Sequence, residues 1–253
     1  MSKDLFSLEG KSALITGGGT GIGLAISHAF VEAGARVIIT GRREELLRES
    51  CAALGPHASY HACDVTKLSA LPGLVEKIEG GGIALDILVN NAGINAKKPA
   101  LEVSDEEFDQ VVQTNLNGLF ALTREVGKRM AARGRGTILN ISSMTALYGI
   151  PKVPAYSASK TAVIGITRAL AVEWAPLGLR VNAIAPGFIF SDMTDKALNA
   201  EPDRKRRVMD RTPMGRMGHS HEVAAAAVFL CSDAASFITG VNLAVDGGNS
   251  IGF

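Results

Sequence analysis

A run of glycines between an apolar stretch and an amphipathic stretch constrains the fold of this chain most strongly. Thr16-Gly-Gly-Gly-Thr-Gly-Ile-Gly23 begins at the last residue of the mainly apolar stretch 13–16 and opens a segment whose apolar side chains recur at helical spacing as far as Phe30. A second apolar stretch follows at residues 37–40. A strand, a tight turn, a helix and a strand in this order predict a β-α-β unit, and such units build parallel sheets.

The same alternation continues along the rest of the 253 residues, a length that one α/β domain can reach. We therefore predict an α/β fold: one Rossmann-type, doubly wound parallel sheet of about seven strands with helices on both faces. Residues 1–253 are expected to form this single domain, and the polar, irregular stretch 186–218 contains a predicted substrate lid at 188–217. Further strands are expected at 60–63, 85–89, 137–141, 180–184 and 242–245, and helices at 67–79, 104–132, 222–231 and from Pro154 onwards.

Charge and cysteine content exclude several classes of partner. Lys and Arg total 26 against 25 acidic residues, so the chain lacks the basic footprint of a nucleic-acid or membrane-surface protein. Three cysteines without metal-ligand spacing indicate reduced thiols, and His219 and His221 are expected to be capping or surface groups. The opening residues lack the apolar core of a signal peptide. We expect a soluble, cytoplasmic protein with a small-molecule substrate and no metal, nucleic-acid or membrane partner.

The glycine turn predicts a dinucleotide site, because a helix N-terminus offers free N–H groups to a pyrophosphate. The end of the second strand should then select the cofactor. A carboxylate there would bind the ribose hydroxyl of NAD, whereas this sequence has Gly41 followed by Arg42 and Arg43. NADP(H) is therefore expected in preference to NAD, although a turn that binds nothing and arginines that only open a solvated helix are the alternatives. Asp64 could accept a hydrogen bond from the adenine amino group, and residues 90–93 close the next strand at the same edge.

Tyr156 and Lys160 stand one turn apart on one helix face if a helix begins at Pro154. A phenol titrates at about 10, and a neighbouring cation lowers that pKa, so the pair could serve as an acid/base catalyst. Ser143, thirteen positions before Tyr156 and at the end of another strand, could hold a carbonyl or alcohol oxygen. A packed ring and a solvated amine remain the alternative that these residues alone leave open.

The chain resembles the short-chain dehydrogenase/reductase family over essentially its full length, through motifs in the right order and spacing: Thr16-Gly-x-x-x-Gly-x-Gly23, Asn90-Asn-Ala-Gly93, Asn115, Ser143, Tyr156-x-x-x-Lys160 and Pro186-Gly187. The resemblance implies that Tyr156 donates or accepts the proton and that Lys160 binds the nicotinamide ribose and lowers the phenol pKa. Ser143 would polarise the substrate carbonyl, with Ser142 as a rival that the spacing disfavours. Asn115 would distort its helix and hold a water that links Lys160 to bulk solvent.

The resemblance also implies contacts with the nicotinamide end of the cofactor. Ser191 stands five residues after Pro186, where the family usually has a threonine on the carboxamide, so the hydroxyl is kept and a methyl is lost. The residues expected to bind the cofactor are Thr16, Gly17, Gly19, Thr20, Gly21, Ile22, Gly23, Arg42, Arg43, Asp64, Val65, Asn91, Ala92, Gly93, Tyr156, Lys160, Pro186, Gly187, Ile189 and Ser191.

The function implied by the resemblance is hydride transfer between NADP(H) and a carbonyl or secondary alcohol, by a homotetramer. The opening "LFSLEGK" resembles gluconate 5-dehydrogenases and glucose dehydrogenases, whereas "GFIFSDMT" and "RTPMGRMG" equally resemble 3-oxoacyl-carrier-protein reductases. Sugar, sugar-acid and oxoacyl thioester substrates thus stay open, and a non-catalytic cofactor sensor is a remote alternative. Arg204-Lys-Arg-Arg207 could attract a carboxylate or an acidic carrier protein, but a solvated helix face is favoured. The expected substrate pocket is mostly apolar, lined by Asn95, Met144, Ala146, Leu147, Ile150, Ile189 and Phe190.

Overall fold

The computed structural model describes residues 4–191 and 201–252. One parallel sheet of seven strands runs through this part of the chain, in the order β3-β2-β1-β4-β5-β6-β7. The order reverses between β1 and β4, and this point is where doubly wound sheets open a crevice for ligands. The predicted fold class is confirmed. The strands are β1 (Ser12–Thr16), β2 (Arg36–Gly41), β3 (Ala58–Ala62), β4 (Ile87–Asn90), β5 (Gly136–Ile141), β6 (Leu179–Pro186) and β7 (Asn242–Val245).

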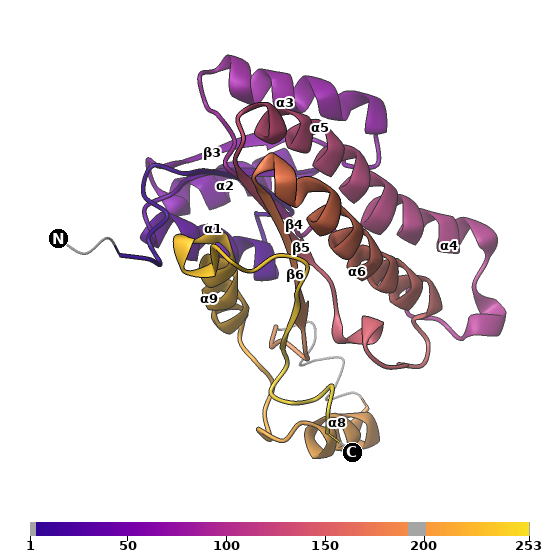
Figure 1. Cartoon of the computed structure of the whole chain (residues 1–253). Helices are drawn as coiled ribbons and strands as arrows, with labels where there is room; N and C mark the ends of the chain where they lie inside the picture. The colour runs from indigo at the N-terminus through magenta and orange to yellow at the C-terminus, as the bar shows by residue number, and fades with distance from the viewer. Residues whose placement is uncertain (1–3, 192–200, 253) are drawn as a thin grey trace.

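Helices cover both faces of the sheet, as Figure 1 shows. On one face lie α1 (Gly21–Glu32), α2 (Glu44–Leu54) and α9 (Ser220–Cys231); on the other lie α3 (Leu71–Gly80), α4 (Asp105–Val112), α5 (Gly118–Ala132) and α6 (Pro154–Trp174). Successive residues of β1 alternate between the two aliphatic cores, with Ile15 in the first and Leu14 in the second. Burial on both faces explains why the inner strands β1, β2 and β4 read as nearly continuous apolar runs.

The long helix expected over 104–132 is interrupted. Its start is confirmed, because the Ser104 hydroxyl accepts a hydrogen bond from the Glu107 backbone N–H and the Glu107 carboxylate accepts one from the Ser104 N–H. A π-helical segment, Gln113–Asn117, separates α4 from α5. Such segments insert an extra residue into a helix and often occur at functional sites.

A further helix, α8 (Pro202–Arg211), lies within the stretch 186–218 that was expected to be irregular. Pro202 opens it and Arg211 lies in its last turn, which are favourable positions for these residues. The apolar period that would have revealed it is missing, because Val208 is its only buried residue. Smaller differences are that β4 begins at Ile87 and that a 3₁₀ turn, Leu68–Ala70, precedes α3. Residues 192–200 of the predicted lid lie outside the described residues.

In the two described segments, we find no helix that combines the length and the apolar character needed to cross a bilayer.

Candidate active site

Glycines allow α1 to pack directly against the turn that precedes it. Gly17 has a φ of 65°, and its N–H donates to the Thr40 carbonyl over 2.7 Å. A Cβ at Gly23 would stand 2.2 Å from the Gly17 carbonyl oxygen, a distance that no side chain tolerates. Asn91 braces the turn from β4, since its Nδ2 donates to the carbonyls of Thr16 and Gly17. The backbone of the turn is thus fixed in shape without a side chain in its path.

Thr16 ties the end of β1 to the end of β4. Its hydroxyl donates to the Val89 carbonyl and accepts hydrogen bonds from the N–H groups of Asn91 and Ala92, each over 3.0 Å. The loop that follows β4 is therefore held beside the glycine turn. Thr16, Gly23 and Asn91 shape the predicted cofactor site and do not line its cavity.

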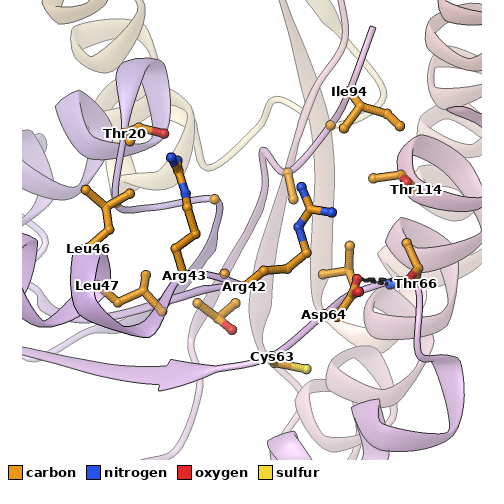
Figure 2. Close-up of a pocket in the computed structure, with 17 residues that line it drawn as sticks. Thr20, Arg42, Arg43, Leu46, Leu47, Cys63, Asp64, Thr66, Ile94 and Thr114 are labelled. Atoms are coloured by element: carbon orange, nitrogen blue, oxygen red, sulfur yellow. Dashed lines mark hydrogen bonds between the residues drawn. The ribbon is translucent and has the colours of Figure 1, made fainter. Parts of the chain in front are cut away.

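A hollow of about 180 Å³ lies at the carboxyl ends of β1, β2, β3 and β4. Figure 2 shows Arg42 and Arg43 extending into it from the end of β2, Arg43 toward Thr20 and Arg42 on the side of Asp64. Neither arginine takes part in an ion pair within the described residues. Nine predicted residues line the hollow: Gly17, Gly19, Thr20, Arg42, Arg43, Asp64, Val65, Ala92 and Gly93.

The Asp64 carboxylate is oriented by its own loop. It accepts hydrogen bonds from the backbone N–H and the hydroxyl of Thr66, over 3.0 and 2.8 Å. Burial tends to raise the pKa of Asp64, but these hydrogen bonds and the Arg42 charge outweigh it, so the pKa lies below its usual range. The Asp64 carboxylate is therefore ionised and can accept a hydrogen bond from an amino group of a ligand in the hollow.

Tyr156, Lys160 and Ser143 meet where α6 crosses the end of β5. The Lys160 ammonium lies 5.5 Å from the centre of the Tyr156 ring and donates to the Ile141 carbonyl over 2.6 Å. Burial lowers the pKa of Lys160 to about 8. Ser143 follows β5, and its oxygen accepts a hydrogen bond from the Thr145 N–H. Side chains predicted from two separate segments therefore converge on one place.

The pKa of Tyr156 departs from the expectation. Burial raises it above the ordinary value of a phenol, and a hydrogen bond with Ser143 opposes this rise without reversing it. Lys160 was expected to lower it, but the ammonium is itself buried and bonded to Ile141, so burial dominates for both groups. At neutral pH the phenol is protonated, which suits a proton donor.

Asn115 links the loop after β4 to α6. Its Oδ1 accepts from the Ile94 N–H over 2.8 Å, while its Nδ2 donates to the Ile94 carbonyl and to the Ser159 hydroxyl. Ser159 in turn donates to the Tyr156 carbonyl. The distortion expected at Asn115 is the π-helical segment, which presents the side chain to the interior. A Cβ at Gly93 would stand 3.2 Å from Asn115 Oδ1 and 3.6 Å from Lys160 Nζ, so glycine leaves room for both.

Ser142, the rival of Ser143, has another partner. Its hydroxyl donates to the Lys160 carbonyl over 3.2 Å, and the residue is 1% exposed. Ser142 therefore fastens α6 to β5, which leaves Ser143 as the hydroxyl beside Tyr156.

Other predicted residues lie away from the hollow. Gly21 and Ile22 begin α1 beneath the turn. Pro186 ends β6, and Gly187 abuts the backbone of Asp246, where a Cβ would come within 2.6 Å. Ile189 forms a β-bridge with Gly218, and Ser191 is exposed. The prediction missed several residues that line the hollow, although most are neighbours of its motifs: Leu46, Leu47, Cys63, Thr66, Ile94 and Thr114.

A second cavity, of about 300 Å³, lies between α8 and residues 148–152. Of the apolar lining expected for the substrate pocket, only Ile150 belongs to it. Arg204 is half-buried and Arg207 is exposed, as expected for a solvated helix face, and both also line the cavity. The sequence did not show this, because no signal identified α8 as a helix.

Comparisons with known proteins agree with this geometry. The family model described as enoyl-(acyl carrier protein) reductase matches residues 17–250. Galactitol 2-dehydrogenase (L-tagatose-forming) of Cereibacter sphaeroides is 43% identical over 98% of both chains. A 3-oxoacyl-[acyl-carrier-protein] reductase of Rickettsia prowazekii is 41% identical over 96% of this chain and 98% of its own. The crystal structure of a gluconate 5-dehydrogenase from Burkholderia cenocepacia in complex with NADP and tartrate matches with a TM-score of 0.94, at 35% identity and 99% coverage of both chains.

Proposed function

Because the chain belongs to the short-chain dehydrogenase/reductase family and is an oxidoreductase of CH–OH groups with NAD(P), we propose that it prefers NADP(H) and acts on a sugar or sugar acid. One observation carries the cofactor preference. Arg42 and Arg43 extend into the hollow from the end of β2, and no acid stands at Gly41 to bind a ribose hydroxyl.

The residues present fit a dinucleotide. Gly17 and Gly23 keep side chains away from the turn, so the backbone and the N-terminus of α1 could approach a pyrophosphate. Arg42 and Arg43 would hold the 2'-phosphate, and Asp64 would accept from the adenine amino group. NADPH, when bound, supplies the hydride.

The residues around Tyr156 would handle the proton. In the reductive direction the protonated phenol gives its proton to the substrate oxygen while the Ser143 hydroxyl donates a hydrogen bond to the same atom. Lys160, with a pKa of about 8, is mostly charged at pH 7 and would stabilise the phenolate that remains. In the oxidative direction the same phenolate takes the alcohol proton. Asn115 would position this group through Ser159 and would provide the proton route behind Lys160.

The names of the relatives support a polyhydroxylated substrate. One similar protein is named for the polyol galactitol and another for the sugar acid gluconate. A 3-oxoacyl thioester is the second candidate, because a reductase named for that substrate is 41% identical.

A substrate panel tests this proposal. NADPH and NADH oxidation are followed by absorbance with keto sugar acids, ketoses and 3-oxoacyl thioesters. We expect turnover with the sugar-derived ketones and a lower KM for NADPH than for NADH. Equal or better use of NADH would contradict the cofactor proposal, and turnover of thioesters alone would favour the second candidate. No turnover with any compound would favour a cofactor-sensing regulator.

We also propose that the chain is a cytoplasmic homotetramer. Support comes from exposed large apolar side chains just before α4, on α4 and on α5, namely Leu101, Phe108 and Phe120. Light scattering after gel filtration checks the mass, and a monomer at micromolar concentration would contradict the proposal.

A further inference from the structure

The cavity beside α8 concentrates positive charge. Five cationic side chains line it and only one carboxylate does: Lys97, Lys152, Arg204, Arg207 and Arg211 against Glu201. Tyr148, Ile150 and Phe188 add apolar surface. The cavity shares no lining residue with the cofactor hollow.

Helix geometry divides the charges of α8 between two faces. Arg204, Arg207, Val208 and Arg211 recur three and four residues apart and all line the cavity. Arg206 does not line it; its guanidinium lies 3.3 Å from the Asp203 carboxylate, and both side chains are largely exposed. Three arginines of the helix therefore line the cavity, of which Arg207 is also exposed, and Arg206 on the outer side is paired with Asp203.

Few of these cations are neutralised. Glu201 lies 2.5 Å from Lys97 and 3.4 Å from Arg204, and it is the only carboxylate on the cavity wall. Arg211 stacks 4.1 Å from the centre of the Tyr148 ring and donates to the Asn249 carbonyl. Among the described ion pairs, none includes Arg207, Arg211 or Lys152.

Lys152 is held in an unusual backbone conformation. Its φ of 67° makes it the one residue other than glycine with a positive φ in the described ranges. Its carbonyl accepts a hydrogen bond from the Lys98 N–H, which fixes this conformation next to Lys97. Strained residues of this kind concentrate at ligand sites.

Like charges around a small cavity repel one another, and an anion bound between them offsets this unfavourable electrostatic free energy. A carboxylate also matches the fork of an arginine. Residues 148–152 belong to the segment that joins Ser143 to Tyr156, and the Tyr148 hydroxyl on the cavity wall donates to the sulfur of Met144, which directly follows Ser143. We propose that Arg207 and Lys152 bind the carboxylate of an anionic, polyhydroxylated substrate whose reacting carbon lies at Tyr156. This inference rests on the proposed function and selects a sugar acid over a neutral polyol.

Calorimetric titration with matched ligands tests the inference without relying on turnover. D-gluconate and D-glucitol have the same carbon chain and differ at one end, as do D-threonate and D-threitol. For the NADP⁺-loaded protein we expect at least one acid to bind about tenfold or more tightly than its polyol, since hydrogen bonds to charged groups contribute this much. Arg207→Gln should remove most of that acid-to-polyol ratio.

Two further variants keep the test specific. Lys152→Asn removes the charge while keeping a residue that tolerates positive φ, and it should also lower the ratio. Arg206→Gln removes an equal charge from the outer face of α8 and should leave the ratio unchanged.

Equal binding of acid and polyol in both pairs, or an unchanged ratio in Arg207→Gln, would overturn the inference. So would tight binding of an acyl-carrier protein that weakens equally in Arg206→Gln and Arg207→Gln, because that pattern indicates a carrier-docking surface. Acid binding without turnover of any substrate would contradict the proposed function and leave the anion site standing.

Discussion

The hollow proposed to bind the cofactor and the cavity proposed to bind the substrate are built by different means. The hollow lies at strand ends and glycines whose backbone is held by hydrogen bonds such as those of Thr16 and Asn91, and Arg42 and Arg43 extend into it. The cavity is formed by α8 and residues 148–152, with long cationic side chains on a helix that buries only Val208. A fixed backbone suits a ligand that many enzymes share. Substitutions on a peripheral helix, in contrast, can alter the substrate specificity without disturbing the sheet.

Removal of Tyr156, the proposed proton donor, should have the largest effect. Tyr156→Phe deletes the proton donor, so we expect turnover to fall about a thousandfold or more. NADPH binding, measured by fluorescence titration, should stay within about twofold. Retained turnover would contradict the assignment of the proton donor, and lost NADPH binding would show that the residue belongs to the cofactor region.

Gly23→Ala should break the cofactor region alone. The added methyl would meet the Gly17 carbonyl at 2.2 Å, so we expect NADPH affinity to fall about tenfold to a hundredfold. Gly73→Ala is the matched control, because a Cβ there meets nothing within 4 Å. Normal NADPH affinity in Gly23→Ala would show that the turn does not require its close contact.

The difference between the hollow at the strand ends and the cavity beside α8 also explains which features the sequence could predict. Local patterns fixed the strand order of the β-α-β unit, the turn at Gly17 and the position of Tyr156 one turn before Lys160. The π-helical segment at Asn115 and the hydrogen bond from Ser142 to Lys160 depend on long-range contacts. The family resemblance implied the helix distortion at Asn115, but nothing predicted the partner of Ser142. The face of α8 that lines the cavity could not be predicted, because the segment is mostly charged and lacks apolar residues at helical spacing.

Arg42→Ala should reduce the preference for NADPH over NADH by about tenfold, because one charge-assisted contact with the 2'-phosphate of NADPH is lost. The measurement is the ratio of kcat/KM for NADPH to that for NADH. Arg36→Ala, at the opposite end of β2, is the control and should keep the wild-type ratio. An unchanged ratio in Arg42→Ala would assign the selection of the phosphate to another residue.

Replacing Lys160 should have the smallest of these effects, and that effect is on how the free energy of unfolding depends on pH. Its pKa of about 8 lies below the ordinary value of a lysine, so between pH 8 and 10.5 the unfolded chain holds the extra proton. The free energy of unfolding should therefore gain a contribution that rises by about 1 kcal/mol per pH unit in this window. Urea unfolding at pH 8 and pH 10 should show this gain in the wild type and not in Lys160→Met. The exposed control Lys128→Met should behave like the wild type, and an identical pH dependence in Lys160→Met would contradict the lowered pKa.

The hollow and the cavity should act independently, and the ratio of kcat/KM for NADPH to that for NADH tests this most directly. This ratio is measured in the wild type, Arg42→Ala, Arg207→Gln and the double variant. Arg42→Ala should lower it by the same factor in both backgrounds, and Arg207→Gln should leave it unchanged, because the two cavities share no residue. A shift in the ratio caused by Arg207→Gln, or a different effect of Arg42→Ala in its presence, would contradict the account.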